Sequence, residues 1–213
     1  MAPPPSRFIG LSVSGLRRPV YNSTVLIFGY GSVGRQLGKM LAAMGTTVIA
    51  VRRSAPAAGD TSGPIAVHPP SALAALLPTI DTVVIAAPIT PETRGVFDTN
   101  MLGRLRDGAT VVNVGRPEIV DEDAMWAEVA ANRIGFAADV WWNESTMSGY
   151  VPAGAFFGSR HPFHTRDNVV MTPHFGGGVG LAGIEDERAE AVFSTVTEAL
   201  AGRRQPCDLE LGY

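Results

Sequence analysis

The organisation of this chain is set by TVLIFGYGSVGRQLGKMLAAMGTTVIAV, which runs from Thr24 to Val51. Its first five residues are a continuous apolar run, which is typical of a strand buried on both faces. Apolar residues at helical spacing follow over Val33–Met44, and Gly45 is a plausible helix terminator. A second apolar run, Thr46–Val51, completes a strand, helix and strand. This order predicts two parallel strands joined by a crossover helix.

The same alternation continues along the chain as far as Met171. It predicts an α/β fold, a doubly wound parallel sheet of Rossmann type with a C-terminal helix. We expect an N-terminal extension over 1–23, a dinucleotide-binding domain over 24–178, and a helix and tail over 179–213. The further strands expected are Ile65–Val67, Thr82–Ala86, Thr110–Val114, Ile134–Val140 and Asn168–Met171. The further helices expected are Ser71–Leu77 with Ser71 as its cap, Asp98–Leu105, Asp121–Asn132 and Val179–Ala201.

The composition of the chain argues against several classes of function. The chain has 213 residues, of which 46% are hydrophobic and 17% charged, so we expect a packed core. A net charge of −3 gives no indication of nucleic-acid binding, and no apolar run reaches the roughly 18 residues of a membrane span. The single cysteine, Cys207, excludes a multi-cysteine metal site, and we expect no metal. Residues 1–59 contain no acid; we expect a cytoplasmic protein, with organelle targeting as the alternative.

A glycine motif stands between the first strand and the first helix. In Gly29–Gly34 the first glycine permits a tight turn, and Gly31 lets the backbone approach a pyrophosphate. The last glycine lets helix and strand pack closely, and free N–H groups at the helix start attract phosphate oxygens. The motif predicts a nicotinamide dinucleotide site; the alternative is a turn that only reverses the chain. The expected cofactor-binding residues here are Gly29, Tyr30, Gly31, Ser32, Val33 and Gly34.

The end of the second strand bears on which dinucleotide binds. NAD-binding domains usually carry an acid there, which accepts hydrogen bonds from the ribose hydroxyls. Here Arg52, Arg53 and Ser54 occupy the place, and no acid appears before Asp60. A guanidinium suits a 2′-phosphate, so NADP is predicted in preference to NAD. The alternative is a solvated basic turn with no role in cofactor choice.

Beyond residue 80 the sequence resembles the D-2-hydroxyacid dehydrogenase family. The resemblance rests on IAAPITPETRGVFD (Ile85–Asp98), on Gly108–Glu144 and on NVVMTPHFGGG (Asn168–Gly178). With the glycine motif it covers about Thr24 to Gly202, and the basic N-terminal half looks most like the glyoxylate/hydroxypyruvate reductase branch. The family implies an oxidoreductase that transfers hydride between a nicotinamide and the carbonyl carbon of a 2-oxo acid.

The resemblance also implies three catalytic residues. The family's N-x-x-R stretch places the substrate-binding arginine at Arg116, its acid at Glu144, and the histidine of its T-P-H turn at His174. A planar guanidinium suits a carboxylate, and histidine donates protons near neutral pH. Glu144 would orient and tune His174 through a hydrogen bond.

Further residues are expected around the cofactor by resemblance. Asp139 would contact the nicotinamide carboxamide. The other residues expected to line the cleft are Ala87, Pro88, Asn113, Val114, Gly115 and Gly177. Trp141 and Trp142 are adjacent, so an extended chain would place one in the core and the other beside the substrate cleft. His161 and His164 favour loop positions over metal binding because no further ligands stand nearby.

Three features depart from the family pattern. Only 28 residues precede Gly29, so we expect the family's substrate-binding domain to be largely absent. Pro117 follows Arg116 where the family has glycine, which should hold Arg116 extended. The stretch Ser145–Arg166 is longer than the family pattern. Apolar residues on the last predicted helix, together with the family's habit, predict a homodimer. The alternative to a reductase is a catalytically inactive NAD(P)-binding module, as a truncated chain or a redox-sensing interaction protein.

Overall fold

The computed structural model describes residues 19–55, 59, 64–144, 158–177 and 183–201. The chain divides into two compact units, Met1–His174 and Phe175–Tyr213. Most of the predicted stretch Ser145–Arg166, the start of the last predicted helix and Cys207 lie outside the described residues.

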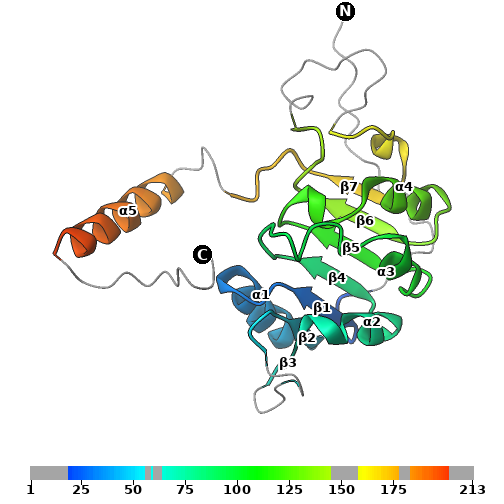
Figure 1. Ribbon diagram of the computed structural model, residues 1–213, viewed down its shortest axis with the longest axis horizontal. Helices are drawn as coiled ribbons and strands as arrows, with labels where there is room; N and C mark the ends of the chain where they lie inside the picture. Colours follow the sequence, from blue (N-terminus) through cyan, green and yellow to red (C-terminus); the bar gives the residue numbers. More distant parts are fainter. Residues whose placement is uncertain (1–18, 56–58, 60–63, 145–157, 178–182, 202–213) are drawn as a thin grey trace, which may run out of the picture. The chain divides into compact units, whose positions relative to one another are not determined.

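The first unit is built on one parallel sheet of seven strands in the order β3-β2-β1-β4-β5-β6-β7 (Figure 1). The strands are β1 (Thr24–Phe28), β2 (Thr47–Val51), β3 (Ala66–His68), β4 (Thr82–Ile85), β5 (Thr110–Asn113), β6 (Gly135–Ala138) and β7 (Val169–Met171). Every neighbouring pair is parallel. The predicted doubly wound parallel sheet of Rossmann type is confirmed.

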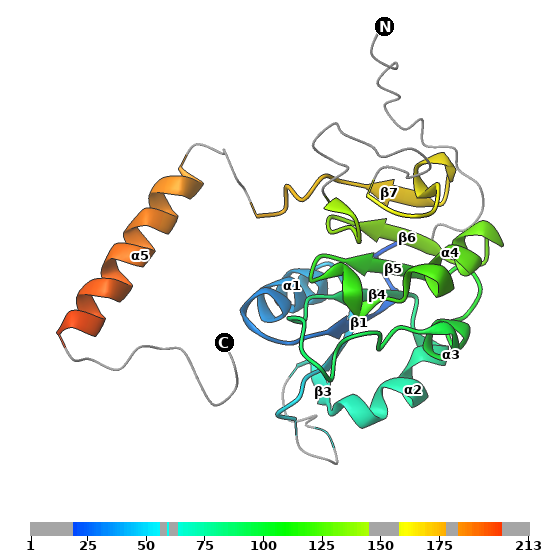
Figure 2. The same ribbon diagram turned by 45° about the horizontal axis from the view of Figure 1, so that its top comes forward.

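Helices cover both faces of the sheet (Figures 1 and 2). The α-helices of this unit are α1 (Ser32–Ala43), α2 (Leu73–Leu76), α3 (Thr99–Gly103) and α4 (Glu122–Ala130). Short 3-10 turns are η1 (Pro70–Ala72), η2 (Leu77–Thr79), η3 (Pro117–Ile119) and η5 (Phe163–Thr165). The figures show α1 on one face and α2, α3 and α4 on the other.

The alternation of side chains along β1 explains the two layers. Val25 and Ile27 belong to a small core cluster with residues of α1. Leu26 and Phe28 point to the opposite face and join the main core, which includes residues of α2, α3 and α4. A strand buried on both faces must be apolar at every position, which is the pattern that the sequence carries.

The helix ends follow from local chemistry. Gly45 adopts a positive φ of 76° after α1, as a helix terminator should. Asp98 and Asp121 cap α3 and α4 by accepting from the backbone N–H groups of Met101 and Ala124, both at 2.8 Å. The predicted cap at Ser71 is wrong. Pro70 opens a 3-10 turn one residue earlier, because proline suits a first helical position, and neither η1 nor α2 has a side-chain cap.

The second unit contains α5 (Ile184–Leu200), within the helix predicted at the end of the chain. Its Val192 and Phe193 side chains are 63% and 74% exposed. Across the described residues, no helix combines the length and apolar character that a membrane span requires.

Candidate active site

The predicted site segments all leave the sheet at one edge. In parallel strands the carboxyl ends lie along the same edge, and ligands of such folds bind where the strand order reverses. Here the order reverses between β1 and β4. The segments that follow the strands are Gly29–Gly34 after β1, Arg52–Ser54 after β2, Ala87–Pro88 after β4, Val114–Arg116 after β5, Asp139–Glu144 after β6 and Thr172–His174 after β7.

The glycine loop is packed where glycine is required and open where a ligand would approach. Gly29 has a φ of 101°, and a Cβ there would collide with the backbone nitrogen of Ala87. A Cβ on Gly34 would collide with the carbonyl oxygen of Gly29. Gly31, in contrast, has no atom within 4 Å of an added Cβ. The loop therefore leaves space above Gly31, as the close approach of a pyrophosphate requires.

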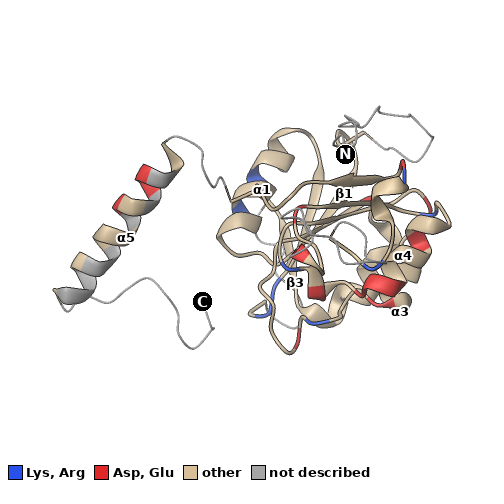
Figure 3. Cartoon of the chain, turned by 90° about the horizontal axis from the view of Figure 1, so that it is seen from above, with Lys and Arg blue, Asp and Glu red and all other residues tan. Residues whose placement is uncertain are grey.

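The start of α1 fits an anion. Gly31 is its N-cap and provides no side-chain hydrogen bond, and no acid lies in the first turn. The free N–H groups and the positive end of the helix dipole therefore remain available to phosphate oxygens. Figure 3 shows Lys and Arg, and no acid, on α1; these residues are Arg35 and Lys39.

The other loop residues differ in exposure. Ser32 and Val33 are exposed at the start of α1. Tyr30 is half-buried, and its ring lies 3.2 Å from the position of a Cβ on Gly38. Gly38 therefore lets the Tyr30 ring lie close to α1, where it joins the small core cluster.

The basic turn after β2 lies beside β3. The Arg52 backbone N–H donates to the carbonyl of His68 at 3.0 Å, and Arg53 and Ser54 are exposed. The pKa of Glu92 is lowered below its ordinary value. The causes are a hydrogen bond from the Thr90 side chain, a hydrogen bond from the backbone of Glu92 itself, and the positive charge of Arg53. Arg53 is therefore within electrostatic range of the loop that follows β4.

Asn113 braces the turn that carries Arg116. Its side chain is fully buried; Oδ1 accepts from the Gly115 N–H at 3.1 Å and Nδ2 donates to the Arg116 carbonyl at 3.0 Å. The sequence predicts that Asn113 lines the cofactor cleft, but the structure directs its carboxamide into this turn. A Cβ on Gly115 would lie 2.6 Å from the Ala87 carbonyl oxygen, so the turn packs directly against the segment after β4.

Arg116 itself has the backbone expected before a proline. Its φ of −139° and ψ of 141° are extended, as Pro117 predicts. The exposed guanidinium donates from Nη1 to the Gly115 carbonyl at 2.8 Å. Within the described part of the chain, it makes no hydrogen bond to Glu144 or His174. The structure thus places Arg116 at the same sheet edge as these two residues without joining it to them.

Glu144 and His174 form a pair. Nδ1 of His174 lies 3.0 Å from Oε1 of Glu144, and the two side chains are 46% and 42% exposed. This contact leaves Nε2 of His174 directed away from the carboxylate. His174 also has a φ of 58°, a left-handed conformation that is uncommon outside glycine and often marks functional residues.

Thr172 anchors the turn before His174. Its N–H donates to the Ala138 carbonyl at 3.0 Å, and its hydroxyl donates to Oδ1 of the buried Asp139 at 2.6 Å. The Thr172 carbonyl accepts from the indole N–H of Trp141 at 3.1 Å. The T-P-H turn is thus fixed to the end of β6. The sequence pattern identified Thr172 only as a motif residue and did not indicate these contacts.

The prediction that Trp141 and Trp142 face opposite sides is wrong. Their rings lie 6.2 Å apart and both pack against Phe136 and Phe163. The alternation expected of a strand does not apply, because β6 ends at Ala138. Trp141 is 1% exposed.

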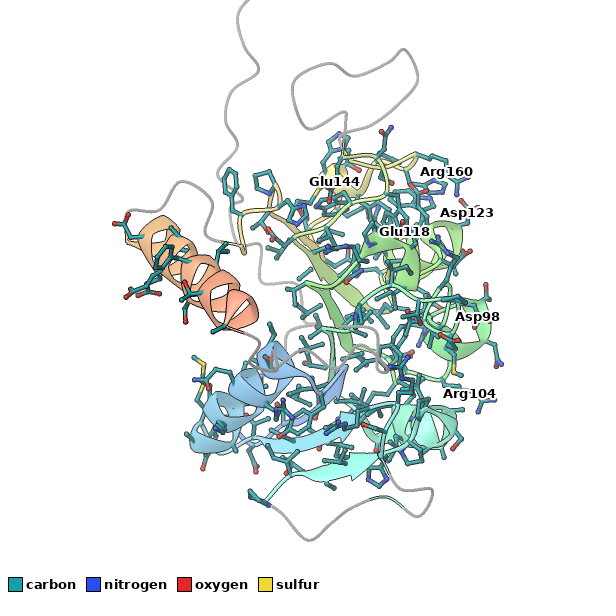
Figure 4. The ribbon with its side chains drawn as sticks, turned by 60° about the vertical axis from the view of Figure 1, so that its left-hand side comes forward. Asp98, Arg104, Glu118, Asp123, Glu144 and Arg160 are labelled. Carbon is teal, nitrogen blue, oxygen red and sulfur yellow. The ribbon has the colours of Figure 1, made fainter. Side chains whose placement is uncertain are left out.

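The chain returns to α4 just before Phe163. Buried Glu122 accepts from the Ser159 hydroxyl at 2.7 Å and from the Arg160 N–H and Nε at 2.6 and 2.8 Å. The hydrogen bonds to Glu122 and its negative charge raise the pKa of Arg160, and the negative charge of Asp123 adds a smaller effect in the same direction. Figure 4 labels Arg160 and Asp123 on this side of the unit, together with Glu144. One residue before Ser159, the Gly158 carbonyl accepts from the N–H of Asn143, so this clamp holds the chain beside the residue that precedes Glu144.

The two histidines of HPFH lie in different local structures, His161 in a loop and His164 within η5. His161 lies 2.7 Å from Asp123 and stacks on Trp126 with ring centroids 5.3 Å apart, and His164 is exposed. No group of three His, Cys, Asp or Glu side chains that could hold a metal ion occurs among the residues that the structure describes.

The chain is similar to known proteins over most of its length. Residues 13–176 match the family described as D-isomer specific 2-hydroxyacid dehydrogenase, NAD binding domain. D-3-phosphoglycerate dehydrogenase 2 of Arabidopsis thaliana is 30% identical over 92% of this chain and 27% of its own length. Hydroxypyruvate reductase of Thermotoga maritima is 27% identical over 75% of this chain and 47% of its own length. The chain therefore spans less than half the length of either relative.

Solved structures show the same fold. An NADPH-dependent glyoxylate/hydroxypyruvate reductase from Sinorhizobium meliloti, in complex with NADP and sulfate, matches with a TM-score of 0.72 and 25% identity over 90% of this chain and 57% of that one. A D-isomer specific 2-hydroxyacid dehydrogenase from Xanthobacter autotrophicus Py2, in complex with NADPH and MES, matches with a TM-score of 0.71 and 27% identity over 90% and 73% of the two chains.

The seven-stranded parallel sheet with a glycine loop at its switch point defines a nicotinamide-dinucleotide-binding domain of Rossmann type. The chain belongs to the D-isomer specific 2-hydroxyacid dehydrogenase family, a family of NAD(P)-dependent oxidoreductases.

Proposed function

We propose that the protein transfers hydride between NAD(P)H and a 2-oxo acid, forming a 2-hydroxy acid, with His174 as general acid and base. The observation that carries this proposal is the 3.0 Å contact between His174 and Glu144 at the sheet edge that also carries the glycine loop. A histidine with one nitrogen held by a carboxylate has its other nitrogen free to give a proton to a carbonyl oxygen.

Three residues divide the work on the substrate. Arg116 binds the carboxylate and carbonyl of the 2-oxo acid through its planar guanidinium. His174 donates a proton from Nε2 to the carbonyl oxygen during reduction and accepts it in the reverse direction. Glu144 holds Nδ1 and so fixes the orientation of the imidazole ring. In this mechanism the guanidinium of Arg116 exchanges the Gly115 carbonyl for the substrate, a rotation that its exposed position permits.

The dinucleotide supplies the hydride when bound. The residues proposed to hold its pyrophosphate are those of Gly29–Gly34, with Gly31 at the open position. Arg52 and Arg53, with Ser54, would bind a 2′-phosphate, so we propose NADP as the preferred cofactor. The solved relatives with NADP and NADPH bound support this preference. From the family resemblance we propose that Asp139 contacts the nicotinamide carboxamide.

We also propose a homodimer. The apolar Val192 and Phe193 side chains of α5, which are 63% and 74% exposed, form a surface that suits a second copy of the chain. Sedimentation or light scattering of the purified chain measures its mass directly, and a monomer at all concentrations would contradict this proposal.

A second candidate function is a nucleotide-binding module without turnover. It is favoured by the exposure of Glu144 and His174, since catalysis by charged groups is weakened where water has access. In that case His174→Ala would leave the cellular effect of the protein intact while Gly31→Asp would abolish it.

A titration separates the two candidates. NADPH and NADH are added separately to the purified chain, binding is followed by nicotinamide fluorescence, and glyoxylate, hydroxypyruvate, pyruvate and bulkier 2-oxo acids are then added. Oxidation of NADPH that depends on the 2-oxo acid and disappears in His174→Ala supports the reductase. Tight binding with no oxidation by any acid overturns it and supports the binding module.

A further inference from the structure

One buried residue contacts both sides of the Glu144 and His174 pair. The backbone N–H of Trp141 donates to Oε1 of Glu144 at 3.4 Å, and its indole N–H donates to the Thr172 carbonyl at 3.1 Å. Oε1 of Glu144 is the same atom that meets Nδ1 of His174. Thr172 begins the turn that carries His174 two residues later. The position of Trp141 therefore bears on both partners of the pair.

The Trp141 ring has little freedom to move. It packs edge-on against Phe136 and Phe163, with ring centroids 5.8 and 5.9 Å away. A Cβ on Gly158 would lie 2.9 Å from Trp141 Cβ and Cγ, so the backbone of Gly158 lies directly on the side chain. Gly158 in turn accepts from the Asn143 N–H at 3.0 Å, which fixes the chain one residue before Glu144.

We propose that Trp141 is a positioning residue that sets the separation of Glu144 and His174. The inference rests on the proposed function, in which these two residues act as a pair. It adds a residue of the aromatic core that is 1% exposed. The physical reason is that Glu144 and His174 are half exposed, and an exposed ion pair does not hold long side chains in one geometry. A buried, rigid donor that fixes the backbone on both sides removes that freedom.

The chain offers a matched control in the next residue. Trp142 also donates its indole N–H to a backbone carbonyl, that of Val120 at 3.0 Å, and packs on the same Phe136 and Phe163 rings. Trp141→Phe and Trp142→Phe therefore remove one equivalent hydrogen bond each from the same aromatic cluster. Only the first bond is connected to the T-P-H turn.

The test measures the His174 imidazole directly. Two-bond ¹H–¹⁵N spectra, assigned with His174→Ala and recorded where the ring is neutral, report which nitrogen carries the proton. In the wild type Nδ1 faces Glu144, so we expect the Nδ1–H form to predominate. Trp141→Phe should mix the two tautomers and lower kcat for a 2-oxo acid about three- to tenfold, the value of one hydrogen bond. Trp142→Phe should match the wild type in both measurements, and neither variant should change the Kd for NADPH.

The outcomes separate the two claims. Equal tautomer ratios in the two variants and the wild type would overturn the role of Trp141 and leave it as a core residue only. A tautomer change confined to Trp141→Phe, in a chain that turns over no 2-oxo acid, would support the positioning role while contradicting the proposed function. If Trp141→Phe does not fold, benzothienylalanine at position 141 keeps the size and shape of the ring and removes only the N–H donor.

Discussion

The carboxamide of Asn113 donates to the carbonyl of Arg116 at 3.0 Å while it is itself fully buried. The Asn113 side chain thus fixes the backbone of Arg116, the proposed substrate-binding arginine. We expect Asn113→Ala to raise the KM for a 2-oxo acid about tenfold. The turn would lose two hydrogen bonds, and the Arg116 guanidinium would no longer be held in the orientation that binds the substrate. NADPH titration should give an unchanged Kd.

Asn168→Ala is the matched control for that change. Asn168 donates from Nδ2 to the carbonyls of Val129 and Ile134, so it is also a bracing amide, but it lies before β7 and away from Arg116. Both variants should lower the free energy of unfolding by about 1–3 kcal/mol, while only Asn113→Ala raises the KM. An equal rise in KM in both variants would count against a specific role for Asn113.

The glycines of the loop should separate folding from binding. Gly31→Ala meets open space and a negative φ of −84°, so only the poorer N-cap should cost stability, and the free energy of unfolding should stay within about 1 kcal/mol of the wild type. Its methyl group would occupy the place of the phosphate, and the Kd for NADPH should rise at least about tenfold. Gly29→Ala should instead destabilise the fold by more than about 2 kcal/mol, because φ is 101° and the Ala87 backbone is in the way. Urea unfolding and fluorescence titration measure the two effects, and a Gly31→Ala protein that binds NADPH normally would show that the pyrophosphate lies elsewhere.

Arg52 is expected to decide between the two dinucleotides. Removing a guanidinium from a phosphate typically costs about tenfold or more in affinity. Arg52→Ala should therefore raise the Kd for NADPH about tenfold and leave the Kd for NADH within about twofold. Arg53→Ala is the comparison: the charge of Arg53 already acts on Glu92, so its loss should have the smaller effect on NADPH. Equal losses for NADPH and NADH in Arg52→Ala would mean that the basic turn has no role in cofactor choice.

The contact between Asp123 and His161 predicts a pH dependence of stability. The hydrogen bond from His161, with the charge of Arg160, lowers the pKa of Asp123 below its ordinary 3.8. A carboxyl group with a lowered pKa in the folded state stabilises the fold above its unfolded pKa, and the effect is lost as pH falls through the folded pKa. Asp123→Asn should therefore lower the Tm at about pH 6, and the difference from the wild type should shrink as the pH falls below the ordinary 3.8 and through the lowered folded-state pKa. Thermal unfolding across this pH range tests this, and a Tm difference that persists in acid would assign the effect to packing.

Arg133 joins the ends of two helices and predicts a large effect on stability. Its guanidinium pairs with Glu128 and donates to the carbonyls of Leu105 and Leu102, at 2.6 and 2.7 Å. The hydrogen bond to Glu128 is the main cause that raises the pKa of Arg133. Arg133→Ala should cost about 2–4 kcal/mol in urea unfolding, since two carbonyls and a carboxylate lose their donor. Arg104→Ala, an exposed arginine at the end of α3 (Figure 4), should change stability by less than about 0.5 kcal/mol. A similar loss in both would indicate that only surface charge matters.

Much of the fold follows from the sequence because its signals are local. Continuous apolar runs such as Thr24–Phe28 predict strands buried on both faces, and β1 has these bounds. Glycines and acids that end or cap helices, among them Gly45 and Asp121, act within a few residues of their own position. A local signal of this kind is complete in the sequence itself. At Pro70 and Ser71 two local preferences compete: proline favours the first position of a helix, and serine favours the N-cap. The fixed φ of proline determined where the turn begins, so Ser71 does not cap it.

The motifs of the candidate site were also readable in sequence, and their meeting at one sheet edge follows from parallel strands alone. What each side chain contacts was decided by tertiary structure. Asn113 turns inward to brace Arg116, the rings of Trp141 and Trp142 join one aromatic cluster, and the Trp141 indole reaches Thr172, 31 residues along the chain. These contacts depend on how β5, β6 and β7 lie beside one another. Sequence periodicity specifies which face of a strand is buried, but the partner of a buried polar group depends on residues that only folding brings within hydrogen-bond distance.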